Sequence, residues 1–428
     1  MTDARVSRMA GGLIGSEILR IAADVRAMAG RGEKVCNLTV GDFDPRQFPA
    51  PQSLISGIVT ALQAGETNYP PSDGVPELRR AVVDFYRRHL GLEYPLESIL
   101  ITGGSRPGIY ATYRTLVDPG DTVVYPAPSW NNNHYCHLVD ARGVAVPCEA
   151  ADAFLPTRAS LEPVVRGARL LALNSPLNPA GTAFRAEVLA DICDLVLEEN
   201  ARRGPGERPL FVMYDQVYWM LTFGETRHVD PVSLRPEMRD YTVFVDGASK
   251  AFAATGVRVG WTAAPPDVSR RMASTLGHVG AWAPRAEQVA LAGLLADDAA
   301  ITAYHEVMRR GVQQRLDALH EGMMALQARG FPVEAIVPMG AIYLSVRLAL
   351  HGWRTPDGAV LTTNDEIRRY LLEEAAVAVV PFQAFGMPDE TGWFRLSVGA
   401  VSVDEIPAAM ERLDRALTAL SPADAAAA

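Results

Sequence analysis

One lysine stands among small residues in the segment Asp246–Trp261, whose sequence is DGASKAFAATGVRVGW. This lysine is Lys250, and Arg258 follows eight positions later with a glycine on either side. A lysine amine that is partly desolvated by such neighbours has a lowered pKa and can form a Schiff base with an aldehyde. An arginine fork near Ser249 and free backbone amides would suit a phosphate group. Together these features predict a site for pyridoxal phosphate (PLP), an aldehyde that carries its own phosphate.

The alternative is an ordinary strand followed by a loop with one solvent-exposed lysine. Single lysine and arginine side chains are usually solvated, so the segment taken alone favours this alternative. Whether Lys250 is a cofactor lysine therefore depends on the residues that the rest of the chain brings beside it.

Apolar runs that predict buried strands recur along the chain, and each is followed by residues that could contact a ligand. Ligands of parallel sheets bind at the carboxyl ends of the strands. The run 99–102 leads into a glycine-rich turn and a helix N-terminus, which binds anions through free N–H groups and the helix dipole. The later runs, 122–125, 170–173, 210–214 and 241–245, are followed in turn by Trp130, Asn178, Asp215 and Lys250. Because so many candidate ligand-binding residues are expected at one edge of the sheet, a cofactor role for Lys250 is favoured over a solvent-exposed lysine.

The alternation of these strands with amphipathic helices, such as 186–202, predicts an α/β fold with a mostly parallel, helix-covered sheet. A helical region over 286–329, interrupted at Asp297-Asp298, should connect this sheet to a smaller α+β domain. In that domain we expect strands over 342–346, 377–380 and 394–397, and helices over 364–375 and 404–420. Another helix is expected over 15–28. The expected parts are an N-terminal segment (1–45) that packs with the small domain, a large PLP-binding domain (46–312), and a small C-terminal domain (313–428) whose tail is disordered from about residue 421.

Composition limits the partners and the compartment. The 428 residues carry a formal net charge of −10 without long blocks of like charge, which argues against nucleic acid or an anionic membrane. No apolar run reaches the roughly 18–20 residues of a membrane span, and Met1 to Met9 are not followed by the apolar stretch of a signal peptide. The four cysteines show no CxxC pairing, so neither a zinc site nor a disulfide framework is indicated. We therefore expect a reduced, cytoplasmic protein that binds no metal.

Four motifs together resemble those of the class I/II PLP-dependent aminotransferases of fold type I. Gly247–Gly260 resembles the PLP-lysine signature of that family, and Phe394-Arg395-Leu396-Ser397 resembles its C-terminal arginine motif. Asn178-Pro179-Ala180-Gly181 resembles its Asn-Pro-x-Gly motif, and Asp215-Gln216-Val217-Tyr218 its Asp-x-x-Tyr motif. The resemblance covers nearly the whole chain and is closest to the aspartate aminotransferase-like branch. It implies a large domain with a mostly parallel seven-stranded sheet, a smaller α+β domain, and PLP as the cofactor.

The resemblance also implies roles around the cofactor ring. Lys250 would hold PLP as a Schiff base and then act as the base that moves the proton between the substrate Cα and the cofactor. Asp215 would pair with the pyridine nitrogen and keep it protonated, which maintains the ring as an electron sink. Asn178 and Tyr218 would hydrogen-bond the 3′-oxygen of the ring, and Trp130 would stack on the ring.

A second set of residues would hold the phosphate and the substrate. Tyr69 would reach the phosphate from the neighbouring subunit, which implies a homodimer. Arg395 would grip the substrate α-carboxylate bidentately, near the Gly41 backbone. Gly247 stands where many relatives have a phosphate-binding serine, so that one hydrogen bond is in doubt. The phosphate site itself would consist of Gly104, Ser105, Arg106, Ser249 and Arg258.

The expected reaction transfers an amino group between an amino acid and a 2-oxo acid, but the identity of the substrate stays open. A dicarboxylic substrate such as aspartate or glutamate needs a second cation near the site. The available cations are Arg46, Arg227, His228 and Arg285. Aromatic residues near the expected site would equally suit a broad or aromatic specificity, namely Phe43, Tyr69, Trp219 and Phe382.

Two other classes of function share part of this pattern. Other PLP chemistry on the same fold, such as that of a lyase, a racemase or an amino-acid cyclase, shares the first steps, so the motifs do not separate it from transamination. A regulatory role is typically accompanied by a fused DNA-binding segment, for which this acidic chain has no room. The motifs therefore favour an enzyme, and an aminotransferase first.

Overall fold

The computed structural model describes residues 5–13, 15 and 17–422. None of the helices in these ranges is long and apolar enough to cross a membrane. The α-helices are α1 (Arg8–Gly11), α2 (Glu17–Gly30), α3 (Gln52–Gln63), α4 (Pro76–Leu90), α5 (Ser105–Leu116), α6 (Asn132–Val139), α7 (Arg158–Val165), α8 (Ala186–Arg202), α9 (Pro231–Leu234), α10 (Ala248–Ala251), α11 (Pro266–Val279), α12 (Arg285–Leu295), α13 (Asp298–Ala328), α14 (Asn364–Ala375) and α15 (Glu405–Thr418). The strands are β1 (Cys36–Asn37), β2 (Ile99–Thr102), β3 (Thr122–Ala127), β4 (Arg142–Pro147), β5 (Leu170–Asn174), β6 (Phe211–Asp215), β7 (Thr242–Gly247), β8 (Gly260–Ala263), β9 (Val333–Ala335), β10 (Tyr343–Leu348), β11 (Trp353–Arg354), β12 (Val377–Ala378), β13 (Val380–Pro381), β14 (Trp393–Ser397) and β15 (Ser421–Pro422).

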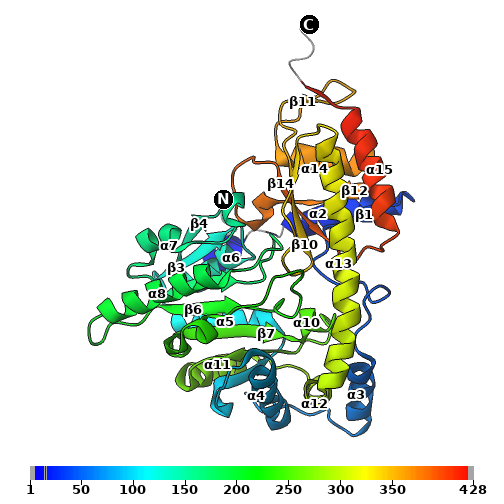
Figure 1. Cartoon of the computed structure of the whole chain (residues 1–428). Coiled ribbons are helices and arrows are strands. Elements are labelled where there is room, and N and C mark those ends of the chain that lie inside the picture. The colour runs from blue at the N-terminus through cyan, green and yellow to red at the C-terminus, as the bar shows by residue number, and fades with distance from the viewer. Residues whose placement is uncertain (1–4, 14, 16, 423–428) are drawn as a thin grey trace.

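A seven-stranded sheet with the order β2-β8-β7-β6-β5-β3-β4 forms the centre of the larger part of the molecule (Figure 1). β8 runs antiparallel to both of its neighbours, and all other neighbouring pairs are parallel. The carboxyl ends of the other six strands therefore share one edge. This arrangement confirms the predicted α/β fold with a mostly parallel sheet.

Helices cover both faces of this sheet because its strands are apolar on both sides. Alternate residues of a strand point to opposite faces. In β6, Val212 and Tyr214 belong to the core that includes α4, α7, α8 and α12. Phe211 and Met213 belong to a second core, which includes α5, α6 and α11. The sheet is thus the middle layer of three.

The smaller part contains an antiparallel sheet with the order β13-β14-β10-β9, which lies above the large sheet in Figure 1. Its core includes residues of α14, α15 and most of α13. The 31-residue helix α13 connects the two parts. Ile301, near its start, packs in the core of the large sheet, whereas Val312 and Leu319 pack in the core of the small sheet. This is the predicted long helical connection.

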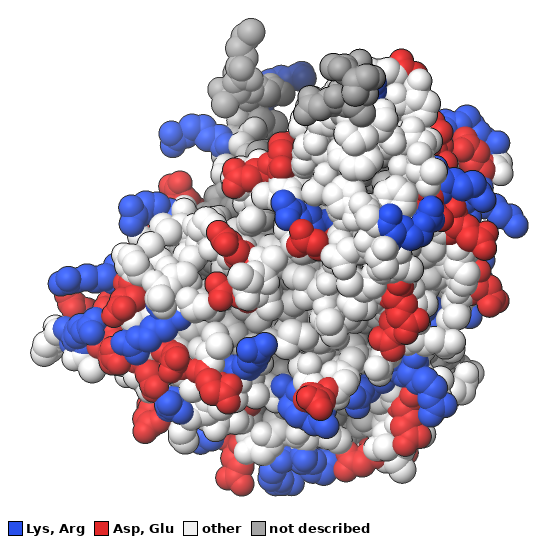
Figure 2. All heavy atoms as spheres, turned by 45° about the horizontal axis from the view of Figure 1, so that its top comes forward, with Lys and Arg blue, Asp and Glu red and all other residues white. Residues whose placement is uncertain are grey.

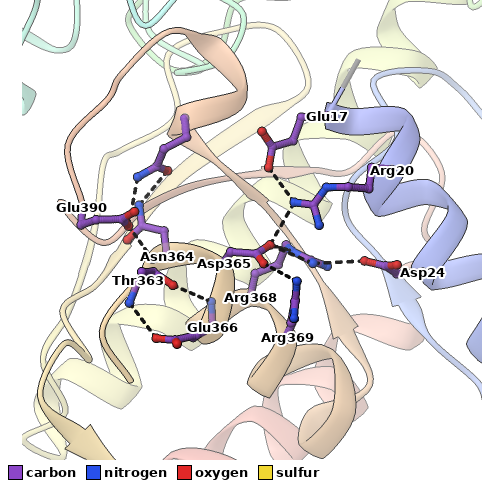
Figure 3. Close-up of polar contacts among 11 residues, drawn as sticks. Glu17, Arg20, Asp24, Thr363, Asn364, Asp365, Glu366, Arg368, Arg369 and Glu390 are labelled. Atoms are coloured by element: carbon purple, nitrogen blue, oxygen red, sulfur yellow. Dashed lines mark hydrogen bonds and ion pairs between the residues drawn. The ribbon is translucent and has the colours of Figure 1, made fainter. Parts of the chain in front are cut away.

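Ion pairs join α2 to α14 (Figure 3). The Arg368 side chain is only 1% exposed, and its Nη2 lies 3.1 Å from Asp24 Oδ2 and 2.9 Å from Asp365 Oδ1. Arg20 of α2 also contacts Asp365, at 3.1 Å. A buried guanidinium needs such partners because desolvation of its charge is costly. Together with the parallel pairing of β1 and β12, these contacts hold residues 17–37 against α14 and β12 of the smaller part.

Most predicted elements occur where the sequence places them. α8 and α14 have the predicted ends, and the region 286–329 is interrupted between α12 and α13. β4 and β8 were not predicted. One expectation is wrong in part, because residues 421 and 422 form β15 and pair with β11 instead of starting a disordered tail. The rest of that tail, 423–428, lies outside the described residues.

Candidate active site

The amine of Lys250 lies at the carboxyl edge of the large sheet. Lys250 is on α10, which begins directly after β7, and its Nζ donates a hydrogen bond of 2.6 Å to the Gly41 carbonyl oxygen. Nζ also lies 5.9 Å from the centre of the Tyr218 ring. Burial lowers the pKa of Lys250 to about 8. The charge of Asp42 opposes this shift, whereas nearby arginines add to it. The amine can therefore gain and lose a proton near neutral pH.

Asp215 ends β6, the strand next to β7 along the same edge. Its Oδ1 accepts a hydrogen bond of 3.2 Å from the Val217 N–H. Burial raises the pKa of Asp215 to about 6, although that hydrogen bond and the positive charge of Lys250 both favour the ionised form. Three residues on, the Tyr218 hydroxyl lies 2.6 Å from the Tyr343 hydroxyl of β10.

An anion site is built where β2 meets α5. Gly104 precedes the first turn of α5 with φ 94°, a conformation that favours glycine. Arg258 donates hydrogen bonds to the carbonyl oxygens of Thr255, at 2.7 Å, and Gly103, at 3.0 Å. A Cβ atom on Gly104 would overlap the Arg258 guanidinium, so only glycine allows this close approach. The free N–H groups of the helix and the guanidinium together suit a phosphate.

The glycines of the lysine segment allow β7 and β8 to pack tightly beside this anion site. Gly247 pairs with Gly260, and a Cβ on Gly247 would lie 2.8 Å from the Gly260 Cα. A Cβ on Gly260 would lie 2.6 Å from the Ser105 nitrogen. The absence of a serine at 247 therefore has a steric reason. Ser249, which is buried, remains close to Lys250 on α10.

Arg395 of β14 lies across from Lys250 and is 1% exposed. Its Nη2 donates to the Thr39 carbonyl oxygen at 2.7 Å and its Nη1 to Asn178 Oδ1 at 3.1 Å. The guanidinium carbon lies 4.7 Å from the Tyr343 ring centre and 4.8 Å from that of Phe385. Its Nε has no hydrogen-bond partner among the described residues. This buried donor is therefore available to an acceptor such as a carboxylate.

Gly41 connects Lys250 and Arg395. Its carbonyl oxygen accepts from Lys250, and a Cβ on Gly41 would lie 3.7 Å from Arg395 Nη1 and 3.0 Å from the Tyr343 hydroxyl. The residue predicted to flank the substrate carboxylate therefore lies between the two key cations. No side chain larger than hydrogen fits there without displacing Tyr343.

Trp130 lies beside Arg106, which is in the first turn of α5 next to the anion site. The Arg106 guanidinium carbon is 5.2 Å from the centre of the Trp130 ring, which lies 6.4 Å from the ring of Phe385. Arg106 forms no ion pair with a described residue. Tyr69 is different: its side chain is 80% exposed and contacts the Trp282 ring at 5.3 Å.

The four cations proposed for a second carboxylate all have other partners. Arg46 pairs with Asp44 and Arg285 pairs with Glu66. Arg227 donates to backbone oxygens of residues 224 and 226. His228 is enclosed in the protein, and burial lowers its pKa to about 3, so it is uncharged at neutral pH.

Sequence reasoning missed several residues of the site, among them Thr39, Tyr343 and Phe385. Each takes part through a contact between distant segments, for which the local pattern carries no signal. Asp42 could have been found, because it directly follows Gly41, which was expected near the substrate carboxylate. Its Oδ1 accepts hydrogen bonds from the Thr255 hydroxyl at 2.7 Å and from the Phe43 N–H at 2.8 Å.

Comparison with known proteins is decisive for the family. The family model for aminotransferases of class I and II matches residues 33–413. The chain belongs to this family. It is 31% identical over 412 residues to the aspartate aminotransferase of Rhizobium meliloti (strain 1021), an alignment that covers 95% of this chain and 94% of that protein. It is 30% identical to the aspartate aminotransferase of Geobacillus stearothermophilus, with 97% and 99% covered.

Solved structures agree with this assignment. The crystal structure of the Rhizobium meliloti aspartate aminotransferase superimposes on this aminotransferase with a TM-score of 0.88 at 30% identity, covering 97% of this chain and 99% of that one. The Thermus thermophilus aspartate aminotransferase with maleate gives a TM-score of 0.84 at 28% identity, with 96% and 99% covered. The protein is thus a PLP-dependent aminotransferase of fold type I.

The chemistry of the edge fits PLP. The anion site around Gly104 and Arg258 suits the phosphate, the amine of Lys250 suits the aldehyde, and the carboxylate of Asp215 suits a protonated ring nitrogen. When bound, PLP supplies an electron sink for the electron pair that remains when a proton leaves the substrate Cα.

Proposed function

We propose that Lys250 binds the PLP aldehyde as a Schiff base and carries the Cα proton of the substrate. Its lowered pKa supports the second role, because a base works best when its pKa is near the working pH. Asp215 would keep the ring nitrogen protonated, and Arg395 would bind the substrate α-carboxylate. The observation that carries the proposal is the convergence of Lys250 and Arg395 on the two sides of Gly41.

We further propose that the amino donor is a dicarboxylic amino acid such as aspartate or glutamate. Several relatives are named aspartate aminotransferases, which supports this substrate class. The remaining requirement is a cation for the second carboxylate. Arg106, to which the resemblance gives a phosphate role, meets it best, because its guanidinium lies over the Trp130 ring and has no ion-pair partner among the described residues. Stacking fixes the plane of a guanidinium and leaves its N–H edge free for a carboxylate.

Replacing Arg106 by glutamine tests this role. We expect kcat/KM for aspartate or glutamate to fall roughly 10- to 100-fold, the value of one charge-assisted interaction. The value for alanine or phenylalanine should change little, and so should the affinity for PLP. A panel of amino acids, followed by the conversion of bound PLP to its amino form, measures all donors in one experiment.

Arg227→Gln is the matched control, since Arg227 is exposed and contacts only backbone oxygens. An equal loss for every donor, together with weaker PLP binding, would instead assign Arg106 to the phosphate and contradict its role in specificity. Ammonia release without a 2-oxo acid would indicate lyase chemistry.

We also propose that the protein is a homodimer. Three exposed apolar residues lie on one face of α3 at helical spacing: Ile55 (42% exposed), Val59 (49%) and Leu62 (50%). The opposite face of α3 packs on α12 in the same chain, and exposed Tyr69 follows α3. A contiguous apolar face of this kind is typical of a protein interface. A second copy that covered it would bring Tyr69 to the neighbouring site.

Sedimentation of the wild type and of Val59→Glu measures this directly. We expect a dimer that dissociates in the variant, because a carboxylate would be buried in an apolar contact. Val337→Glu serves as the control, since Val337 is equally apolar, 66% exposed and in the smaller part. A monomeric wild type, or a variant that remains dimeric, would rule out this interface.

A further inference from the structure

Asp246 is an acidic residue in the interior, directly before the helix that carries Lys250. It is wholly buried in β7, where its neighbours Val245 and Gly247 are buried too. No lysine, arginine or histidine forms an ion pair with it among the described residues. Desolvation raises the pKa of Asp246 to about 7, and hydrogen bonds from its neighbours oppose the shift. Burying a carboxylate without a neighbouring cation costs free energy, so the hydrogen bonds that compensate Asp246 are informative.

Three donors converge on the two carboxylate oxygens. The Gly247 N–H donates to Oδ1 at 2.7 Å. The Trp219 indole N–H and the Tyr86 hydroxyl donate to Oδ2 at 2.9 and 3.0 Å. A peptide N–H and an indole N–H are donors only, so Asp246 must accept from both.

The Tyr86 hydroxyl also donates its hydrogen to Asp246. Its oxygen accepts from the Trp261 indole N–H at 3.1 Å and from Gln216 Nε2 at 3.2 Å. With two donors on its oxygen, its own hydrogen goes to Asp246. His228 Nε2 lies 3.2 Å from Gln216 Oε1 at the far end of this chain of hydrogen bonds. Apart from Tyr86, His228 is the titratable group linked to Asp246, and it is uncharged at neutral pH.

The donors come from the segments that carry the proposed catalytic groups. Gln216 directly follows Asp215, and Trp219 directly follows Tyr218. Gly247 directly precedes α10, which carries Lys250. The Asp246 carboxylate thus connects the start of α10 directly to Trp219, after Tyr218, and through the Tyr86 hydroxyl to Gln216, after Asp215. A shift of about 1 Å between such groups is enough to cost roughly 100-fold in rate.

We propose that Asp246 is a positioning residue whose carboxylate fixes Lys250 relative to Asp215 and Tyr218. The inference rests on the proposed roles of these residues. It explains why an acid, and not an amide, occupies the position. An asparagine would direct its NH₂ group at one of the donors, because all three partners of Asp246 donate.

Asp246→Asn and Tyr86→Phe test the proposal in the PLP-loaded enzyme. For Asp246→Asn we expect kcat to fall roughly 10- to 100-fold, with KM changed much less. The pH at which the absorbance of the bound cofactor changes should shift as well, because Lys250 and Asp215 set it. Tyr86→Phe keeps the acid and removes one donor, so it should change both quantities in the same direction by a smaller factor.

Val243→Ala is the control for lost stability alone. Val243 is fully buried in the same strand but packs on the opposite face, against the core of α5 and α11. This variant should unfold more easily, with kcat and the spectral midpoint unchanged. If Asp246→Asn does not fold, Tyr86→Phe alone decides whether Asp246 positions Lys250 or only stabilises the fold.

Wild-type kcat and an unchanged spectral midpoint in both network variants would overturn the proposal and leave Asp246 a merely structural residue. A failure of the proposed function would already be visible in the wild type, before any variant is compared. In that case the wild type itself would attach no cofactor to Lys250 or transfer no amino group.

Discussion

Lys250→Ala should lower kcat by roughly four orders of magnitude or more, since it removes the amine that we propose both binds the cofactor and moves the proton. Asp42, Asp215 and the arginines remain, so the variant should still bind PLP without a covalent bond. After borohydride treatment, the wild type should gain the mass of one pyridoxyl group on the peptide that contains Lys250. The variant should gain none.

The chain contains few lysines, so the site of pyridoxyl attachment can be identified without ambiguity. Lys34 is the only other lysine in the sequence, and its side chain is exposed, unlike that of Lys250. Lys34→Arg is therefore the matched control, and it should keep both full activity and the attached pyridoxyl group. Ordinary transamination by Lys250→Ala, or attachment at Lys34 in the wild type at stoichiometric PLP, would disprove the assigned role.

Asp215→Asn should lower kcat roughly 10²- to 10³-fold, the range for loss of one preorganised electrostatic partner. The asparagine oxygen can still accept from the Val217 N–H, so the fold of the turn is retained. What is lost is the negative charge that would hold a proton on the ring nitrogen. Asp42→Asn is the control, because Asp42 also acts on the charge of Lys250 but is hydrogen-bonded to Thr255.

The pH dependence gives this prediction a second measurement. The pKa of Asp215 is raised to about 6, so the carboxylate gains a proton and loses its charge as the pH falls through that value. The affinity of the cofactor-free protein for PLP should therefore weaken below about pH 6. In Asp215→Asn this component should vanish, since the amide does not titrate. If Asp42→Asn and Asp215→Asn lowered kcat and the affinity for PLP equally, the effect would come from the net charge of the site and not from a specific role of Asp215.

The location of Asp215 and Lys250 at one edge of the sheet could be predicted because it follows from local rules. Asp215 and Lys250 end apolar runs, and the ends of parallel strands meet at one edge. β8 escaped prediction because it is four residues long and pairs in the antiparallel direction with β2, which is about 160 residues away in sequence. Its orientation depends on that distant partner and not on its own pattern.

Contacts between distant segments explain the other omissions. Tyr343 lies in an apolar run that predicts a buried strand, but only the folded chain places its hydroxyl beside Tyr218. Asp246 did carry a signal, since an acid at the end of a buried strand must have partners. The sequence could not tell that those partners flank Asp215 and Tyr218.

Helix α13 is long enough to couple the positions of the two sheets. At 1.5 Å per residue, its 31 residues span roughly 46 Å, from the core of one sheet to the core of the other. Such a helix acts as a lever arm: a tilt of about 5° at its first turn displaces its last turn by about 4 Å. Arg395 belongs to the sheet at the far end of this lever, and Lys250 lies near its pivot. A change in the packing of Ile301 in the core of the large sheet would therefore be transmitted to the sheet that carries Arg395.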